Sequence, residues 1–324
     1  MTRAAVVGTG FIGPVHVEGL RRAGIEVSGI LGSDPGKSER AAQDLGLDRA
    51  YGSYEELLAD PSVDAVHLAS PNRFHYKQVL QALDAGKHVV CEKPLAMTSE
   101  ETASLVRAAR LHPRQVTALN YNIRFYPLNL EMRERFGRGD LGRVFHVRGA
   151  YVQDWLLRRE DFNWRVLARD GGKTRAVGDI GTHWLDLVTF VTGMELEGVC
   201  ADLKTVHPRR MMAGSGKGTE TFVSQGVSPR AASGKSIRVT TEDYGSVLLG
   251  FKGGARGVMT VSQVTAGRKN QLSYEIAGSK ASVAWDSERP NEVWLGSRSG
   301  ANSSLLRDPS LLSDSARAYS SYPG

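Results

Sequence analysis

The sequence predicts an α/β protein of two domains: an N-terminal doubly wound parallel sheet, then a C-terminal α+β domain with a large open, mainly antiparallel sheet. Strand and helix patterns alternate regularly through the first 120 residues, which is typical of parallel strands joined by right-handed crossovers. From about residue 198, short strands follow one another through brief turns, which indicates antiparallel pairing. The 324 residues, 41% of them hydrophobic, are enough for two such domains.

The N-terminal elements follow from short apolar runs separated by helical periodicity. The run 4–7 before a glycine cluster is typical of a buried parallel strand. Pro35-Gly36 begins a helix, and Gly86 ends another. Strands are expected over 4–7, 25–31, 65–69, 88–91 and 116–120, and helices over 12–23, 37–45, 54–58, 76–85 and 99–111.

The rhythm changes around residues 120–127, so we expect domains over 1–122 and 123–324. Residues 143–153 alternate polar and apolar side chains like a strand with one exposed face, and a helix is expected at about 179–191. Further strands are expected over 198–206, 237–241, 246–251, 255–264, 272–277, 282–285 and 292–295.

Two stretches of the second domain have a composition typical of loops. Residues 211–236 are small, polar and rich in glycine and serine, which predicts a mobile loop. Residues 297–324 are similar, and no convincing last element is expected there before the abrupt end of the sequence.

Composition narrows the class of function. The net charge is +6, but lysine and arginine are scattered among carboxylates without a basic stripe, which favours a soluble basic surface over nucleic-acid binding. Two distant cysteines, Cys91 and Cys200, make neither a disulfide framework nor a zinc ligand set. A strand begins almost at the N-terminus, and no apolar run reaches the ~18 residues of a membrane span. We therefore expect a cytoplasmic protein without a signal peptide or membrane contact.

A glycine-rich turn stands between the first strand and the first helix. In the G-x-G-x-x-G pattern, Gly8 makes the tight turn, Gly10 lets a pyrophosphate approach the backbone, and Gly13 lets helix and strand pack closely. The helix N-terminus then faces the phosphates. This context predicts a dinucleotide-binding Rossmann domain, whose expected contacts are Gly8, Thr9, Gly10, Phe11, Ile12 and Gly13.

The end of the second strand bears on the choice between NAD and NADP. Gly32 stands where an acidic residue usually binds the adenine ribose of NAD. Ser33 and Lys37, with Arg40 close behind, could hold a 2′-phosphate, so the sequence leans slightly towards NADP. Asp34 could still serve NAD, and the basic pair could be a solvated helix face.

Residues that follow two further parallel strands are expected to line the crevice, because ligands bind at the carboxyl ends of such strands. Ser70 and Asn72 should lie on the nicotinamide side; His75 is a further candidate, although it could simply cover the helix. Glu92 and Lys93 follow the next strand, where Pro94 restricts Lys93 to extended geometry. A surface lysine in a turn is the plain alternative.

A carboxylate and an imidazole share one helix face in the second domain. Asp179 and His183 are four residues apart, one turn of helix, and Asp186 follows at three. The group could be a buried polar face. It could also bind a metal, but three ligands on one helix bind weakly without partners elsewhere, so no metal is expected.

Three motifs in this order resemble the glucose-fructose oxidoreductase/inositol dehydrogenase/rhizopine-catabolism (Gfo/Idh/MocA) family: the glycine turn, Cys91-Glu92-Lys93-Pro94, and Gly178 to Asp186. The resemblance covers most of residues 1–295. It implies a Rossmann domain, an open C-terminal sheet often used for oligomers, here a homodimer or homotetramer, and NAD(P)-dependent oxidation of a sugar or cyclitol hydroxyl, or the reverse reduction. Arg175-Ala176-Val177 replaces the usual glycines, and relatives continue beyond the end of this chain, which could be truncated.

The resemblance assigns catalysis to Lys93, Asp179 and His183. Oxidation of a secondary alcohol releases a hydride and a proton, and His183 is the natural base near neutral pH. Lys93 can hydrogen-bond the same oxygen and stabilise a developing alkoxide. Asp179 can orient the substrate and favour the imidazolium form of His183. A relay between Lys93 and His183 leaves the choice of base open.

Substrate contacts are expected where aromatic and polar residues mix. Sugars bind with their C–H face on an aromatic ring and their hydroxyls on polar groups. Residues 151–155 have the sequence Y-V-Q-D-W, and similar Y-x-Q-D-W segments occur in some sugar dehydrogenases of the family. Trp155 and Trp164 could equally be core residues. Besides Lys93, Asp179 and His183, the candidates are Tyr121, Arg124, Gln153, Trp155, Trp164 and Arg165.

Two other functions keep the same fold. An NAD-dependent glycosidase would cleave an aryl glycoside without net reduction of the dinucleotide. A non-catalytic dinucleotide sensor would have no need to keep lysine, aspartate and histidine together, and all three are present. The sequence therefore favours a dehydrogenase.

Overall fold

The computed structural model describes residues 2–212, 235–320 and 322, and the chain divides into two compact units. The first is Met1–Asn120 with the short segment Arg169–Lys173, and the second is Tyr121–Ala168 with Thr174–Gly324. The division falls at Asn120, close to the predicted boundary. The return of Arg169–Lys173 to the first unit is not visible as a pattern in the sequence.

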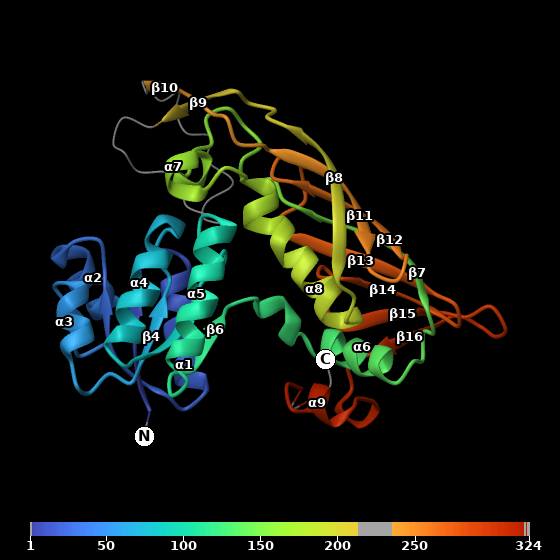
Figure 1. Ribbon diagram of the computed structural model, residues 1–324, viewed down its shortest axis with the longest axis horizontal. Helices are drawn as coiled ribbons and strands as arrows, with labels where there is room; N and C mark the ends of the chain where they lie inside the picture. The colour runs from blue at the N-terminus through green and yellow to red at the C-terminus, as the bar shows by residue number, and fades with distance from the viewer. Residues whose placement is uncertain (1, 213–234, 321, 323–324) are drawn as a thin grey trace. The chain divides into compact units, whose positions relative to one another are not determined.

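The first unit is a six-stranded parallel sheet in the order β3-β2-β1-β4-β5-β6, flanked by helices (Figure 1). Side chains of β1 (Arg3–Val7) point alternately into two cores, Ala5 and Val7 into one and Ala4 and Val6 into the other, so residues 4–7 are all apolar. The strands are β1 (Arg3–Val7), β2 (Glu26–Leu31), β3 (Ala50–Tyr51), β4 (Ala65–Leu68), β5 (His88–Cys91) and β6 (Thr117–Leu119). The helices are α1 (Ile12–Arg22), α2 (Pro35–Leu45), α3 (Tyr54–Ala59), α4 (Asn72–Asp84) and α5 (Ser99–Leu111).

The second unit contains an eight-stranded sheet in the order β16-β15-β14-β13-β7-β12-β11-β8 (Figure 1). Its pairs are antiparallel except β7 with β12, so the predicted mainly antiparallel sheet is confirmed. The strands are β7 (Val144–Val152), β8 (Leu196–Lys204), β11 (Tyr244–Phe251), β12 (Arg256–Ser262), β13 (Gln271–Gly278), β14 (Ser282–Asp286), β15 (Glu292–Gly296) and β16 (Ser303–Leu306).

The two stretches expected to be loops contain regular structure at positions the sequence pattern did not indicate. A separate two-stranded sheet pairs β9 (Arg209–Met212) with β10 (Lys235–Arg238), so both ends of the predicted loop 211–236 are strand. Residues 213–234 of that loop lie outside the described residues. After residue 297 the chain forms β16, a 3₁₀ turn η4 (Pro309–Leu311) and the short helix α9 (Asp314–Arg317), which corrects the expectation of no last element.

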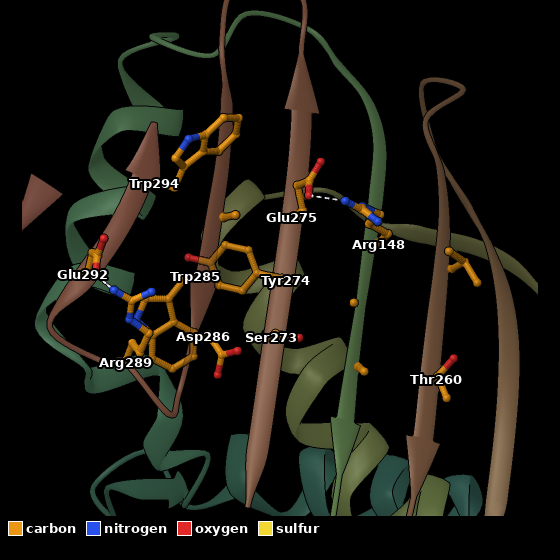
Figure 2. Close-up of a pocket in the computed structure, with 14 residues that line it drawn as sticks. Arg148, Thr260, Ser273, Tyr274, Glu275, Trp285, Asp286, Arg289, Glu292 and Trp294 are labelled. Atoms are coloured by element: carbon orange, nitrogen blue, oxygen red, sulfur yellow. Dashed lines mark hydrogen bonds and ion pairs between the residues drawn. The ribbon is translucent and has the colours of Figure 1, made fainter. Parts of the chain in front are cut away.

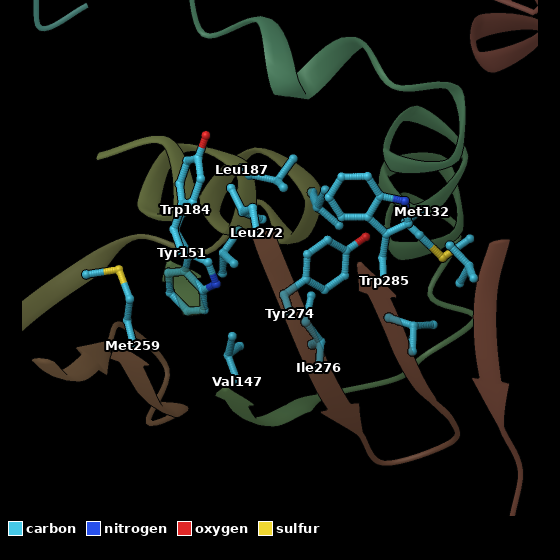
Figure 3. Close-up of a cluster of buried hydrophobic side chains, with 14 of the residues drawn as sticks. Met132, Val147, Tyr151, Trp184, Leu187, Met259, Leu272, Tyr274, Ile276 and Trp285 are labelled. Atoms are coloured by element: carbon cyan, nitrogen blue, oxygen red, sulfur yellow. The ribbon is translucent and has the colours of Figure 1, made fainter. Parts of the chain in front are cut away.

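Helices cover one face of the large sheet. Helix α8 (Thr182–Thr192) packs on it through Trp184, whose indole Nε1 donates to the Ser273 carbonyl oxygen at 2.8 Å (Figure 3). A Cβ on Gly149 of β7 would lie 2.5 Å from that indole nitrogen, so glycine is needed for this close approach. The other helical segments are η1 (Asn122–Phe125), α6 (Pro127–Gly137), η2 (Trp164–Val166), α7 (Ala168–Gly171) and the π-helical turn η3 (Val177–Gly181) directly before α8. Among the residues that the structure describes, no helix is long and apolar enough to cross a membrane.

Candidate active site

Glycines build the turn between β1 and α1. Gly8 has a φ of +122°, and a Cβ there would lie 2.4 Å from the Ala69 carbonyl oxygen. A Cβ on Gly13 would lie 2.0 Å from the Gly8 carbonyl oxygen, because the first turn of α1 closes on the end of β1. The Cβ position of Gly10 has nothing within 4 Å, so there is open space through which a phosphate can approach the backbone. The described residues therefore fit a dinucleotide pyrophosphate; the turn also contains the half-buried Thr9 and Ile12 and the exposed Phe11.

Helix α2 lies close to Gly32, the residue that follows β2, which explains why a glycine stands there. A Cβ on Gly32 would lie 2.9 Å from the Ser38 backbone nitrogen, so an acidic residue does not fit there without a shift. Asp34 caps α2 instead, accepting the Lys37 backbone N–H at 3.0 Å, and this hydrogen bond lowers the pKa of Asp34. Lys37 Nζ donates to Ser33 Oγ at 2.7 Å. Ser33 and Lys37 thus form one exposed cluster at the end of β2.

His75 joins two loops from inside the first unit. Its ring is fully buried, with one nitrogen 2.8 Å from the Ser70 carbonyl oxygen and the other 2.8 Å from that of Pro94. Because the ring has no exposed surface, this geometry favours the covering role that the sequence allowed for His75, and its contact with the cofactor stays a prediction. Asn72 Nδ2 donates to the Gly171 carbonyl oxygen at 2.9 Å, within the same unit.

Lys93 lies in the loop after β5, half-buried, before a cis peptide bond to Pro94. Its neighbour Glu92 is buried: Oε1 accepts from His16 Nε2 at 3.1 Å and from Asn120 Nδ2 at 2.6 Å, and Oε2 accepts the Lys93 backbone N–H at 3.2 Å. Burial raises the pKa of Glu92, but these hydrogen bonds and the Lys93 charge outweigh it and lower the pKa to about 2. Glu92 therefore holds the Lys93 loop from within, and its contact with the cofactor stays a prediction.

Several predicted residues gather at the beginning of α8. Asp179 lies in η3 and His183 in the first turn of α8, so carboxylate and imidazole follow one another along a continuous helical segment. The Tyr121 ring meets the His183 ring edge-on, with 5.3 Å between centroids. Arg165 Nε lies 3.4 Å from Asp179 Oδ1, and its guanidinium lies over the Trp164 ring at 4.4 Å. The second unit thus brings together an acid, an imidazole, a guanidinium and two aromatic rings.

Gln153 and Trp155 stand behind this group. The Trp155 indole donates to Gln153 Oε1 at 2.8 Å, and Gln153 Nε2 donates to Asn270 Oδ1 at 2.7 Å. Tyr151 shares the same Asn270 oxygen at 2.8 Å, and its ring lies 6.0 Å from that of His183. Gln153 and Trp155 are only 3% and 5% exposed, so they support the group from behind, and their contact with substrate stays a prediction.

Asp186 belongs to a different pair. Arg124 binds both of its carboxylate oxygens, with Nε 2.6 Å from Oδ2, and this interaction raises the pKa of Arg124. The guanidinium also lies over the Phe190 ring at 4.8 Å. Asp186 is therefore not a third ligand beside Asp179 and His183, and within residues 2–212, 235–320 and 322 no group of three or more acidic, histidine or cysteine side chains could hold a metal ion.

Comparison with known proteins matches both units. Residues 2–119 match the model described as "Oxidoreductase family, NAD-binding Rossmann fold", and residues 129–284 match the GFO/IDH/MocA C-terminal domain. The chain belongs to the GFO/IDH/MocA oxidoreductase family. The position of Lys93 after β5 and the Asp179/His183 pair before and within α8 are the features on which the sequence resemblance was based.

Relatives in the GFO/IDH/MocA family include a levoglucosan dehydrogenase from Pseudarthrobacter phenanthrenivorans, 29% identical over 82% of this chain and 66% of the relative. A 1,5-anhydro-D-fructose reductase from Ensifer adhaerens is 34% identical over 59% of this chain and 56% of its own. The chain thus spans between about half and two thirds of these curated relatives.

Solved structures agree with the family assignment. Levoglucosan dehydrogenase in complex with NADH and L-sorbose has a TM-score of 0.86 and 26% identity, covering 96% of this chain and 81% of that one. An inositol dehydrogenase homologue complexed with NAD+ from Azotobacter vinelandii has a TM-score of 0.81 and 28% identity, covering 98% and 78%.

The sequence prediction missed the polar residues that hold the GFO/IDH/MocA motif in place. Gln263 donates a hydrogen bond to Asp179, and Arg175 donates a hydrogen bond to Gln263. Gln263 directly follows β12 and continues the alternation of Met259 and Val261, whose apolar side chains are buried. A polar side chain at a position that faces the interior needs a polar partner, and this pattern could have indicated the contact from the sequence.

Proposed function

We propose that this chain is an NAD(P)-dependent oxidoreductase that transfers a hydride between the nicotinamide and a sugar or cyclitol hydroxyl or carbonyl. The observation that carries this proposal is the gathering of Asp179, His183, Tyr121 and Arg165 at the beginning of α8. The same chain has a glycine turn that fits a pyrophosphate, and Lys93 in the loop after β5.

The residues divide the chemistry in the following way. When bound, the dinucleotide supplies the nicotinamide carbon that exchanges the hydride. His183 takes the hydroxyl proton as general base, and Lys93 donates a hydrogen bond to the same oxygen as negative charge develops. Asp179 orients the substrate and stabilises the imidazolium form of His183. Gly8, Gly10 and Gly13 hold the pyrophosphate.

A sugar or cyclitol is the substrate class that the residues around Asp179 favour. Trp164 offers an aromatic face and Arg165 offers guanidinium donors, stacked at 4.4 Å. This combination suits a ring with one apolar face and hydroxyls at its edge. The names of the relatives, a levoglucosan dehydrogenase and a 1,5-anhydro-D-fructose reductase, support the same class.

A panel of free sugars, anhydrosugars and cyclitols with NAD and with NADP tests this proposal. We expect formation of reduced nicotinamide with at least one member, followed by absorbance. Cleavage of an aryl glycoside without net reduction would support the glycosidase alternative instead. Dinucleotide binding without turnover on any member, in either direction, would support a sensor and contradict the proposal.

The same panel decides the cofactor, NAD or NADP. The exposed cluster of Ser33 and Lys37, with Arg40 nearby, favours NADP, because a 2′-phosphate can displace the Lys37–Ser33 hydrogen bond and take both groups as donors. Asp34 already caps α2, so its carboxylate is less available to the adenine ribose of NAD, which also favours NADP. The NADH and NAD+ bound in solved relatives favour NAD. The ratio of kcat/KM for the two dinucleotides is the deciding quantity.

We also propose a homodimer or homotetramer formed through the open face of the large sheet. This face contains the exposed apolar residues Leu248, Val258 and Trp294. It also contains the ion pair Arg148–Glu275 at 2.5 Å, which Figure 2 shows together with Trp294. It also has a shallow depression of about 520 Å³. Exposed apolar strand residues around an oppositely charged pair suit a second copy related by a two-fold axis, because each charge then faces its opposite.

Val258→Glu should convert the oligomer to monomer in sedimentation velocity, because it places an unpaired charge on the interface. Val106→Glu is the matched control: an equally exposed valine on α5 in the other unit, with no expected effect. A wild-type monomer, or an oligomer unchanged in Val258→Glu, would contradict this assembly.

Free thiols at Cys91 and Cys200 are consistent with the cytoplasm as the proposed location.

A further inference from the structure

Gln263 is a completely buried side chain that faces Asp179. It directly follows β12, and its Nε2 donates to Asp179 Oδ2 at 2.9 Å. Its backbone is held as well, with the N–H donating to the Asp243 carbonyl oxygen at 3.0 Å. Both the side chain and its attachment are therefore fixed.

Arg175 determines which way the Gln263 amide faces. Arg175 Nη1 donates to Gln263 Oε1 at 3.0 Å. A guanidinium has donors only, so the amide oxygen must face Arg175, and the NH₂ group must then face Asp179. The opposite orientation would set donor against donor on one side and oxygen against carboxylate on the other.

Arg175 is itself clamped by three consecutive residues. Its Nε donates to Thr241 Oγ1 at 3.2 Å, its backbone N–H to Glu242 Oε1 at 2.8 Å, and its Nη2 to Asp243 Oδ1. Asp243 also binds Arg210 at 2.6 Å, and the side chains of Arg175, Arg210 and Asp243 are 0% exposed. A cation one amide away from Asp179 thus acts in an interior where its field is weakly screened.

We propose that Gln263, held by Arg175, is a positioning residue that keeps the Asp179 carboxylate ionised and aligned for the reaction. This inference rests on the proposed function for the catalytic role of Asp179, whereas the geometry of the hydrogen bonds does not depend on it. It also gives a reason for arginine in the segment where the family usually has glycines: Arg175 is the buried donor that orients the amide.

Other charged or titratable groups act on Asp179 from neighbouring elements. Arg165 from η2 lies beside Oδ1, and His183 follows one turn along the helix. Tyr151 from β7 is buried, and its pKa is raised by burial and by the negative charge of Asp179. The Arg165 side chain is partly exposed to water, whereas Gln263 is completely buried, so Gln263 donates to Asp179 from the buried side.

Gln263→Glu tests the proposal with little change in shape. The new carboxylate keeps an acceptor for Arg175 but turns an oxygen towards Asp179 where the amide had a donor. We expect the pKa of Asp179 to rise by about one unit or more. At neutral pH kcat/KM should fall about 10- to 100-fold, the effect expected of a lost hydrogen bond to a charged group. The loss should grow as the pH falls below neutral, because a raised pKa leaves Asp179 protonated at acidic pH values where it is still ionised in the wild type.

The first readout is independent of turnover. NMR of protein labelled at the aspartate carboxyl carbon, assigned with Asp179→Asn, follows the titration of Asp179 directly. Gln271→Glu is the matched control: Gln271 Nε2 donates to Asp286 Oδ2 at 2.6 Å, so the same chemical change is made at another amide–carboxylate pair of the sheet. It should leave the Asp179 titration unchanged.

The outcomes separate the two proposals. An Asp179 titration identical in wild type and Gln263→Glu overturns the role of Gln263, whether or not the chain oxidises sugars. A raised pKa of Asp179 in Gln263→Glu but not in Gln271→Glu supports it, even if no substrate is found. Full turnover in Asp179→Asn would contradict the proposed catalytic site alone.

Discussion

Replacing Lys93 or His183 by alanine should lower kcat by about 10²- to 10⁴-fold, the usual contribution of a positioned acid or base. Each variant should still bind dinucleotide. His183→Ala removes the proposed base for the hydroxyl proton, and Lys93→Ala removes the proposed donor to the developing alkoxide. Under the proposed mechanism both act on one oxygen, so the double variant should lose much less than the product of the single losses.

Steady-state rates with the best substrate of the panel measure turnover, and calorimetric titration measures dinucleotide binding. Lys77→Ala and His112→Ala are matched controls. Lys77 is an exposed lysine of α4, and His112 follows α5 in a surface pair with Asp84 at 3.6 Å. Near-normal turnover in both the Lys93 and His183 variants would contradict the proposed mechanism. Loss of dinucleotide binding in both would point to disturbed structure instead of lost chemistry.

Much of the fold followed from the sequence because its elements obey simple periods. The buried strands of the first unit and the alternating strands of the second lay where the apolar patterns placed them. Helix α6 was missed because its residues 128–132 alternate apolar and polar side chains, a pattern with a period of two instead of the helical 3.6. Strand β3 has two residues, too few for any period, and β16 and α9 lie in a serine-rich stretch that resembles a loop.

The site was predictable where spacing along one element decides the geometry. The four-residue spacing of Asp179 and His183 predicted one helical segment, and the structure places them in η3 and in the first turn of α8. The hydrogen-bond partners of Glu92 and Gln153 could not be predicted in this way, because the ends of strands show which residues approach the crevice but not which are already bonded inside the domain. Those partners are distant in sequence: Glu92 binds His16 and Asn120, and Asp179 binds Gln263.

Two glycines of the dinucleotide turn should fail in different ways when replaced by alanine. Gly13→Ala brings a Cβ to within 2.0 Å of the backbone oxygen of Gly8, which cannot move without opening the turn between β1 and α1. We expect the free energy of unfolding to fall by about 1–3 kcal/mol, as for overpacked sites, and dinucleotide binding to be lost with the turn. Gly10→Ala meets nothing within 4 Å, so stability should change by no more than about 0.5 kcal/mol. Its methyl group instead occupies the space through which the pyrophosphate approaches, so dinucleotide affinity should fall at least about tenfold, a cost of about 1.4 kcal/mol.

Thermal and urea unfolding measure the first effect, and calorimetric titration with NAD and NADP measures the second. Gly19→Ala is the matched control within the same helix. Its Cβ position is equally open, and alanine should stabilise α1 by up to about 1 kcal/mol without changing affinity. If Gly10→Ala binds dinucleotide as tightly as Gly19→Ala does, the pyrophosphate does not pass over Gly10, and the proposed cofactor site is wrong. If Gly13→Ala is as stable as wild type, the backbone around Gly8 yields more easily than the contact implies. The separation of stability from affinity at two positions of one turn thus distinguishes glycines that build the fold from the glycine that admits the ligand.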